Sequence, residues 1–260
     1  MSNGEQTSSP GGVQSVDRAI TVLEILARDG HAGVSEVAAE VGVHKSTAFR
    51  LLAALEERDL VEQTADRGKY ELGFGILRLA SSIPGRIDMA RQASPILDTL
   101  AQQLHETINL AVIRQHYAVN VQQAYSSSAV ASQNWVGQLT PPHATSSGKV
   151  LLAFMPDEQR DAILDEAGQS RLTDNTITSR RMLLDQLAEI RKSEFATAWE
   201  ELEIGLNASA VPVRDHTGSV VGALSASGPA YRFDKRRISD TEGDVRQAAL
   251  LISRRMGWMG

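Results

Sequence analysis

The sequence predicts an α+β protein of two domains, in which a small, mainly helical domain precedes a larger antiparallel sheet covered by helices. The chain has 260 residues, which is long enough for two hydrophobic cores. Short amphipathic helices and one hairpin fill residues 15–72, whereas residues 87–260 carry strand patterns at both ends with helical patterns between them. We therefore expect a flexible tail (1–14), a first domain (15–72), a linker helix and break (73–86) and a second domain (87–260).

The N-terminal tail and the first helix are separated by a change in composition. The tail, MSNGEQTSSPGGVQ, has neither a basic start nor an apolar core, so it does not resemble a signal peptide. Apolar residues at helical spacing follow and end at Gly30, and we expect Ser15 or Asp17 to cap this helix. It is interpreted as the supporting helix of a three-helix unit.

The stretch GVSEVAAEVGVHKSTAFRLL (33–52) is interpreted as two short helices joined at a glycine. Ser35 is placed to cap the first helix, and Gly42 permits the tight turn that follows it. The second helix is expected to begin near His44. This order is that of a helix-turn-helix unit, in which the second helix lies in the major groove of DNA.

One side of that second helix is apolar and the other is suited to DNA. At about 100° per residue, the alanine and leucine residues at 48, 51, 52 and 55 share one face, which leaves the polar side chains and an aromatic ring exposed. No acidic residue occurs between Val41 and Leu55. Base edges and phosphates are within reach of such a helix start. We therefore assign DNA contacts to Lys45, Ser46, Thr47, Phe49 and Arg50.

A hairpin after the second helix strengthens the prediction, because glycine-joined helix pairs also occur in ordinary globular proteins. Two short strand patterns, 60–63 and 69–72, flank the turn-forming run TADRG. A hairpin directly after a recognition helix is a wing. Arg67 and Lys69 at its tip are expected to contact the DNA backbone or the minor groove.

The charge balance limits how the DNA contacts are made. The chain carries a formal net charge of −6, and residues 1–82 contain eight Lys and Arg against twelve Asp and Glu. This acidity counts against DNA binding by charge alone. Attraction must then come from a few concentrated cations, so binding should be salt-sensitive and depend on dimerisation.

The chain has no cysteine, which excludes disulfides and thiolate metal sites. No apolar run approaches the roughly 20 residues of a membrane span. A cytoplasmic protein without membrane contact is expected, and neither a metal site nor a cofactor is predicted.

The remaining elements follow from periodicity and turn residues. Residues 73–83 look helical and end at Pro84-Gly85, and this apolar segment is expected to pack against a second protomer. The predicted helices are 87–105, 157–166, 179–192 with Thr178 as its cap, and 239–256, and the predicted strands are 107–114, 117–125, 133–136, 195–201, 207–214 and 220–227.

A loop of small residues, 137–149, leads into an apolar helix expected at 150–154. Unpaired N–H groups at such a helix start form a nest for a carboxylate or phosphate. The loop does not match a P-loop, and on its own such a loop is more often a helix cap than a ligand site.

Five motifs occur in order from about Ser15 to Met256: SVDRAITVLEIL, KSTAFRLL, KYELG, PPHATSSGK and LSASGP. In this order they resemble the IclR family of bacterial transcription regulators. The resemblance implies a winged helix-turn-helix domain and a GAF-like effector-binding domain. It also implies homodimers or homotetramers on palindromic double-stranded DNA operators, controlled by a small organic acid or aromatic catabolite.

The resemblance further implies an effector site. It places loop amides at Ser146, Ser147 and Gly148, and hydroxyls at Ser225 and Ser227. Some members have Gly and Ala in place of the two loop serines, and this chain has alanine where a member has a pocket Asp and a pocket Cys. These changes predict a larger, less polar pocket and a bulkier acid. The two alanines are Ala198 and Ala208, and the further side chains expected to line the pocket are Trp135, Leu139 and Phe154.

Two other functions compete with a ligand-responsive DNA-binding repressor. His143 near Ser146 could indicate a Ser/His hydrolase, but the chain has neither a GxSxG elbow nor HExxH, so no catalytic residue is assigned. The other is a GAF-type sensor whose winged helix binds protein.

Overall fold

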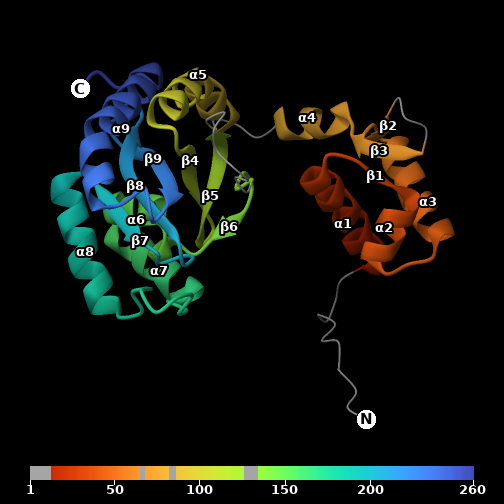
Figure 1. Ribbon diagram of the computed structural model, residues 1–260, viewed down its shortest axis with the longest axis horizontal. Helices are drawn as coiled ribbons and strands as arrows, with labels where there is room; N and C mark the ends of the chain where they lie inside the picture. Colours follow the sequence, from red (N-terminus) through yellow and green to blue (C-terminus); the bar gives the residue numbers. More distant parts are fainter. Residues whose placement is uncertain (1–12, 65–67, 82–85, 126–133) are drawn as a thin grey trace, which may run out of the picture. The chain divides into compact units, whose positions relative to one another are not determined.

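The structure is a computed structural model that describes residues 13–64, 68–81, 86–125 and 134–260 (Figure 1). The chain forms two compact units, Met1–Pro84 and Gly85–Gly260, which are described separately below. No helix among the described residues is long and apolar enough to cross a membrane.

The first unit is a three-helix bundle with a small sheet. Its elements are α1 (Gln14–Asp29), β1 (Ala32–Gly33), α2 (Val34–Val41), α3 (Lys45–Glu56), β2 (Val61–Gln63), β3 (Lys69–Leu72) and α4 (Phe74–Ser81). The three antiparallel strands are ordered β1-β3-β2. Val22, Leu26, Val37, Leu52 and Tyr70 are among the residues that form the buried core. Helix, turn, helix and hairpin confirm the predicted winged helix-turn-helix.

The turn between α2 and α3 is built on Gly42, as predicted. Its left-handed backbone, with φ of 70°, is accessible to glycine at little cost. The predicted caps of the first two helices are wrong. The first turn of α1 closes on the carbonyl of Val13, and α2 begins at Val34, where Glu36 Oε2 accepts a hydrogen bond from the Gly33 N–H at 2.7 Å. Ser35 therefore lies inside the first turn.

The second unit is an antiparallel sheet with helices on both faces. Its helices are α5 (Arg86–Leu104), the short 3₁₀ helix η1 (Pro142–Ala144), α6 (Ser146–Phe154), α7 (Asp157–Ala167), α8 (Arg180–Ser193) and α9 (Lys235–Arg255). Its strands are β4 (Thr107–Arg114), β5 (Tyr117–Ala124), β6 (Leu139–Thr140), β7 (Ala196–Trp199), β8 (Leu206–Arg214) and β9 (Val220–Pro229). They are ordered β6-β5-β4-β9-β8-β7. This arrangement confirms the predicted fold class.

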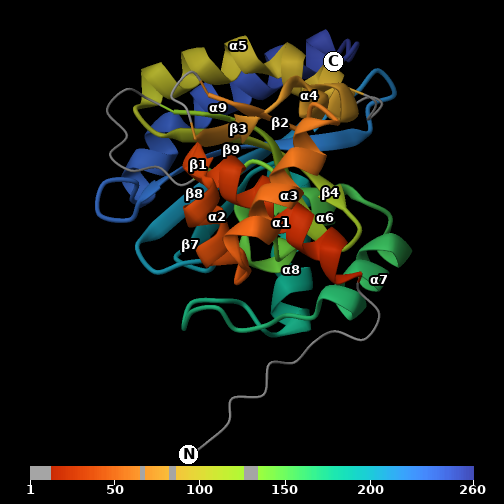
Figure 2. The same cartoon turned by 90° about the vertical axis from the view of Figure 1, so that its right-hand side faces the viewer.

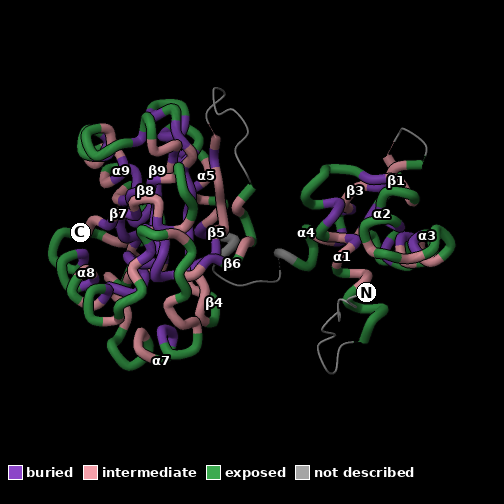
Figure 3. Tube along the Cα trace, turned by 60° about the horizontal axis from the view of Figure 1, so that its bottom comes forward, coloured by how far each residue is buried: buried purple, intermediate pink, exposed green. Residues whose placement is uncertain are grey.

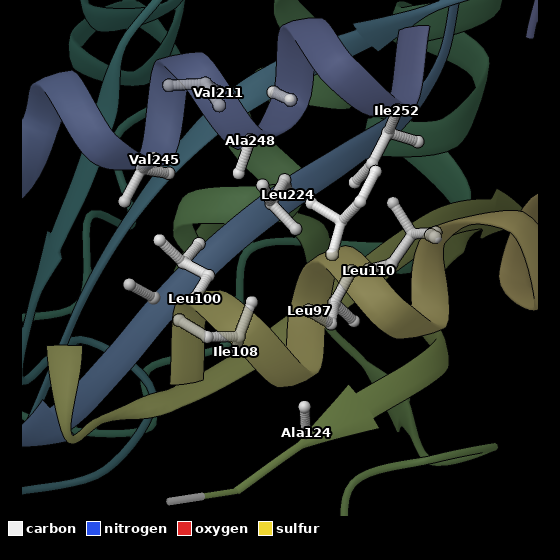
Figure 4. Packing of buried hydrophobic residues seen from close by; sticks show 14 of the residues in the cluster. Leu97, Leu100, Ile108, Leu110, Ala124, Val211, Leu224, Val245, Ala248 and Ile252 are labelled. Atoms are coloured by element: carbon white, nitrogen blue, oxygen red, sulfur yellow. The ribbon is translucent and has the colours of Figure 1, made fainter. Parts of the chain in front are cut away.

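Alternating side chains give the sheet two different faces. On one face, Ile108, Leu110 and Leu224 pack beneath α5 and α9, which lie together on one side of the strands in Figure 2 and meet the sheet in Figure 4. On the other face, Ala111 and Ala223 pack beneath α6 and α8. Figure 3 shows the buried residues concentrated along the strands between these layers. The smaller side chains therefore lie on the α6 face.

Side-chain caps move three predicted helix starts. Helix α6 begins at Ser146 because Thr145 caps it, so the predicted start at 150 is wrong. Helix α8 is capped by Ser179 and not by Thr178, and α9 begins four residues before the predicted Ser239 because Asp234 Oδ1 accepts a hydrogen bond from the Arg237 N–H at 2.8 Å.

The strand predicted at 133–136 is also misplaced. Gln133 lies outside the described residues, and Val136 forms only an isolated bridge to Asn120. The edge strand is instead β6, which pairs with β5 through Ala118 and Thr140.

Candidate functional site

The exposed face of α3 carries the residues predicted to contact DNA. Lys45, Ser46, Phe49 and Arg50 are exposed, and Thr47 is partly buried. Phe49 is 53% exposed although it is aromatic, while Ala48 and Leu52 on the opposite face are fully buried. The helix thus presents two cations, a hydroxyl and an apolar ring to solvent, a combination suited to phosphates and base edges.

The wing is the hairpin formed by β2 and β3, and β1 pairs with the other edge of β3. Lys69 pairs in register with Gly33, and its Nζ donates a hydrogen bond to His31 Nε2 at 3.0 Å. Tyr70 is buried beneath the hairpin, and its hydroxyl accepts a hydrogen bond from Gln63 Nε2 at 2.8 Å. Arg67 lies outside the described residues, so its predicted contact stays a prediction.

A second candidate site is a cavity in the second unit, on the α6 face of the sheet. One wall is the start of α6, where the Thr145 hydroxyl accepts a hydrogen bond from the Gly148 N–H at 3.1 Å. Among the described residues, the N–H groups of Ser146 and Ser147 have no acceptor. The helix start therefore offers two unpaired donors at its positive end.

Much of the cavity floor consists of small side chains from three neighbouring strands. In β7, β8 and β9, Ala198 lies opposite Ala208, and Ala208 lies opposite Ser227. Ser225, two residues before Ser227 on β9, lies opposite Asn109 of β4. The short side chains on this face leave space above the sheet that the helix layer does not fill.

Most residues predicted for the effector site lie together here. Seven of the ten residues named for the effector pocket line the cavity, namely Ser146, Ser147, Trp135, Ala198, Ala208, Ser225 and Ser227. Gly148 and Leu139 are not among its lining residues, and Leu139 on β6 is 57% exposed. A Cβ at position 148 would overlap the backbone of Pro142, so this glycine allows close packing behind the wall.

Several lining residues were not predicted: Asn109, Asn120, Thr140, Leu202 and Leu206. Asn109 could have been found from alternation, since it stands two residues from Ala111 on the face opposite Leu110. Phe154, expected in the pocket, lies elsewhere with its ring 5.1 Å from the guanidinium carbon of Arg214.

A buried ion pair fixes the start of α6, the wall of the cavity, to a neighbouring segment. Lys149 is fully buried, and its Nζ donates to both carboxylate oxygens of Glu201 at 2.6 and 2.7 Å. Burial lowers the pKa of Lys149, whereas the Glu201 carboxylate acts in the opposite direction. Lys149 therefore connects α6 to the segment that follows β7.

His143 is not arranged as a catalytic base. Its Nε2 donates to the Ser170 carbonyl at 3.0 Å, and its Nδ1 has no hydrogen-bond partner among the described residues. Burial lowers the pKa of His143, which favours the neutral ring. The imidazole thus orders the loop by bonding to a backbone carbonyl, and no hydrogen bond joins it to Ser146.

Comparison with known proteins identifies the family to which both units belong. The family model "Bacterial transcriptional regulator IclR C-terminal" matches residues 82–254, and the IclR helix-turn-helix domain matches residues 15–65. The chain belongs to the IclR family. Its IclR-family relatives are named as regulators, so this chain is a DNA-binding transcription regulator with a C-terminal effector-binding domain and not an enzyme.

Individual IclR-family members are similar over almost the full chain. The HTH-type transcriptional repressor AllR of Salmonella typhimurium is 32% identical over 247 residues, covering 95% of this chain and 91% of AllR. The Thermotoga maritima IclR structure has a TM-score of 0.77 and 28% identity, covering 95% of this chain and 100% of that one. An IclR homolog of Microbacterium hydrocarbonoxydans, complexed with 4-hydroxybenzoate, has a TM-score of 0.73 and 26% identity, with coverages of 93% and 98%.

Proposed function

We propose that this IclR-family regulator is a repressor that binds a palindromic operator as a dimer or tetramer and is controlled by a small organic or aromatic acid. The observation that carries the effector class is the unpaired pair of N–H groups at Ser146 and Ser147, facing a cavity floored by alanine and serine. Such donors at a helix start favour a carboxylate.

The apolar part of the cavity lining favours an acid that carries a ring or an aliphatic chain. Ala198 and Ala208 widen the floor, and Trp135, Leu202 and Leu206 add apolar surface. A ring or an aliphatic chain can cover these side chains while its carboxylate lies at the start of α6. The 4-hydroxybenzoate bound to the Microbacterium homolog is an acid of this kind.

The proposed operator contacts divide between bases and phosphates. Ser46 and Arg50 are assigned to base edges, Phe49 to a thymine methyl group, and Lys45 with Thr47 to phosphate. In a dimer, two copies of α3 would enter successive major grooves, which a palindromic operator would match.

Exposed apolar side chains support self-association through the linker helix. On α4, Phe74, Leu77 and Leu79 are 75%, 63% and 58% exposed. Covering them with the same helices of a second copy would remove this surface from water. We propose that residues 73–86 connect a DNA-binding domain (15–72) to an effector-binding and oligomerisation domain (87–260).

The proposed effector class can be tested by deleting a single N–H group. Ser146→Pro removes the donor at a helix position that tolerates proline, whereas Ser146→Ala keeps the N–H and removes only the hydroxyl. Thermal shifts of the full-length protein should show stabilisation by benzoate but not by benzamide. The shift should persist in Ser146→Ala and shrink in Ser146→Pro, and stabilisation by benzamide alone would contradict an acid site.

The proposed regulation has its own measurement. DNA upstream of its own gene should be retarded by the protein in a gel shift, and an acid that stabilises the protein should release that DNA. An acid that tightens the complex would contradict the induced-repressor assignment. Failure to retard this DNA at low salt would instead favour the GAF-type sensor with a protein-binding winged helix.

A further inference from the structure

The polar groups of the cavity floor are gathered on one side of it. Alanine and leucine side chains from β7, β8 and the segment between them form one part, represented by Ala198, Ala208 and Leu206. The other part comes from β4, β5 and β9. Its polar side chains are Asn109, Asn120, Ser225 and Ser227. A molecule that fills the cavity therefore meets an apolar surface and a polar surface on the same floor.

Asn109 is the polar residue whose hydrogen bonding is incomplete. The residue is 5% exposed, and its Nδ2 donates only a long hydrogen bond of 3.4 Å to Ser227 Oγ. Its Oδ1 is buried and has no hydrogen-bond partner among the described residues. A buried amide oxygen without a donor is unfavourable, and a ligand that supplies the donor removes this cost.

The register of the sheet fixes where this group lies. Asn109 is paired with Ser225 across the β4–β9 ladder, and both residues line the cavity. Leu110, the next residue along β4, faces the opposite core beneath α5 and α9. The amide of Asn109 is thus held on the cavity side of a strand whose other face is firmly packed.

We infer that Asn109 is a specificity-determining residue that selects acids bearing a hydroxyl group over otherwise identical acids without one. The inference rests on the proposed acid site at the start of α6, and it adds a second point of recognition on the floor. A hydroxyl suits this place because it donates to an amide oxygen and can also accept from an amide N–H or a serine hydroxyl. The remaining body of the ligand covers the alanines of β7 and β8.

Matched pairs of acids test this assignment on the full-length protein. Dissociation constants would be measured by calorimetry for benzoate, 3-hydroxybenzoate and 4-hydroxybenzoate, and for hexanoate and 6-hydroxyhexanoate. In at least one pair the hydroxy acid should bind about tenfold more tightly, the size expected of one buried hydrogen bond. Asn109→Leu should reduce that ratio to about one while the acid without a hydroxyl still binds.

Two further variants control for folding and for amide loss elsewhere. Asn109→Ser keeps a hydroxyl, but its shorter side chain ends farther from the cavity, so the affinity ratio of the hydroxy acid to the plain acid should fall here too. This variant keeps the test valid if Asn109→Leu folds poorly. Gln122→Leu removes an amide whose Nε2 donates to Ser94 Oγ at 2.9 Å, beyond the residues that line the cavity, and should preserve the ratio.

The outcomes separate this inference from the proposed effector class. Equal affinities within every pair, or a preference that survives in both Asn109 variants, would overturn the role of Asn109 and leave the acid site standing. Binding of none of the five acids would overturn both.

Discussion

Lys149 Nζ lies 2.6 Å from Oε1 and 2.7 Å from Oε2 of Glu201, and both side chains are buried. The two residues are 52 positions apart in the chain. Lys149 belongs to the first turn of α6, and Glu201 follows β7 and precedes Leu202, which lines the cavity. The pair therefore fixes the distance between the wall that offers N–H groups and the segment that borders the apolar floor.

Removing one partner of this pair should be far more damaging than removing both. Lys149→Met leaves a buried carboxylate without its cation, which costs about 3–5 kcal/mol of unfolding free energy. The double variant Lys149→Met with Glu201→Leu should recover most of that loss, because no charge remains buried. Chemical denaturation followed by tryptophan fluorescence measures both, and equal stabilities of the single and double variants would contradict this account.

Two glycine-to-alanine substitutions should shift stability in opposite directions. At Gly148, a Cβ would lie 2.6 Å from Thr145 Oγ1 and would also overlap Pro142, so the start of α6 must move. At Gly243 in α9, a Cβ meets nothing within 4 Å, and alanine should add roughly 0.5–1 kcal/mol through helix propensity. Thermal unfolding should thus rank Gly243→Ala above the parent protein and Gly148→Ala below it. Acid binding should fall only in Gly148→Ala.

Stability should depend on the protonation of His143. Because burial lowers its pKa in the folded state from 6.5, the unfolded chain takes up the proton first as the pH falls. The contribution of His143 to folding is therefore fully present above pH 6.5 and is lost below it, with a slope of at most ~1.4 kcal/mol per pH unit.

His143→Gln should flatten the pH dependence of unfolding below pH 6.5, measured by urea titration at several pH values. His216→Asn, in the exposed turn between β8 and β9, serves as the matched control. An identical slope in the His143 variant and the parent protein would exclude this residue as the source.

The assigned DNA contacts predict two different kinds of loss. Arg50→Ala should weaken binding to the operator by about 1–3 kcal/mol while sparing the weak binding to unrelated DNA, because a base contact carries the sequence information. Lys45→Ala should weaken both and reduce the salt dependence by about one phosphate per protomer. Fluorescence anisotropy at several salt concentrations distinguishes them. An Arg50 variant with unchanged operator preference would rule out the base contact, and neither variant should alter acid binding.

Local signals explain which parts of the fold were predictable. The turn at Gly42 and the hairpin ending in Lys69–Leu72 depend on a few adjacent residues, so they follow directly from the sequence. Helix starts were harder, because Thr145 and Asp234 act as caps only through hydrogen bonds to residues three positions ahead. A polar residue before an apolar run does not show by itself which of several candidates caps the helix.

The cavity was predictable only in part, because it depends on contacts between distant segments. Ser146 and Ser225 came from a family resemblance, whereas Asn109 required the cross-strand register of β4 and β9. Lys149 was grouped with the loop that opens α6, but its partner Glu201 is brought to it by the tertiary fold. Sequence periodicity reports which face a residue occupies and not which residue lies opposite.

The two-faced sheet separates what keeps the second unit folded from what it can recognise. Large aliphatic side chains such as Ile108, Leu110 and Leu224 are on the α5–α9 side, while alanine and serine make up much of the cavity floor. Exchanging Ala198 or Ala208 for another small or medium-sized residue would reshape the ligand space without disturbing that core. A scaffold with this division can acquire new ligands by few substitutions, in nature or in the laboratory construction of biosensors.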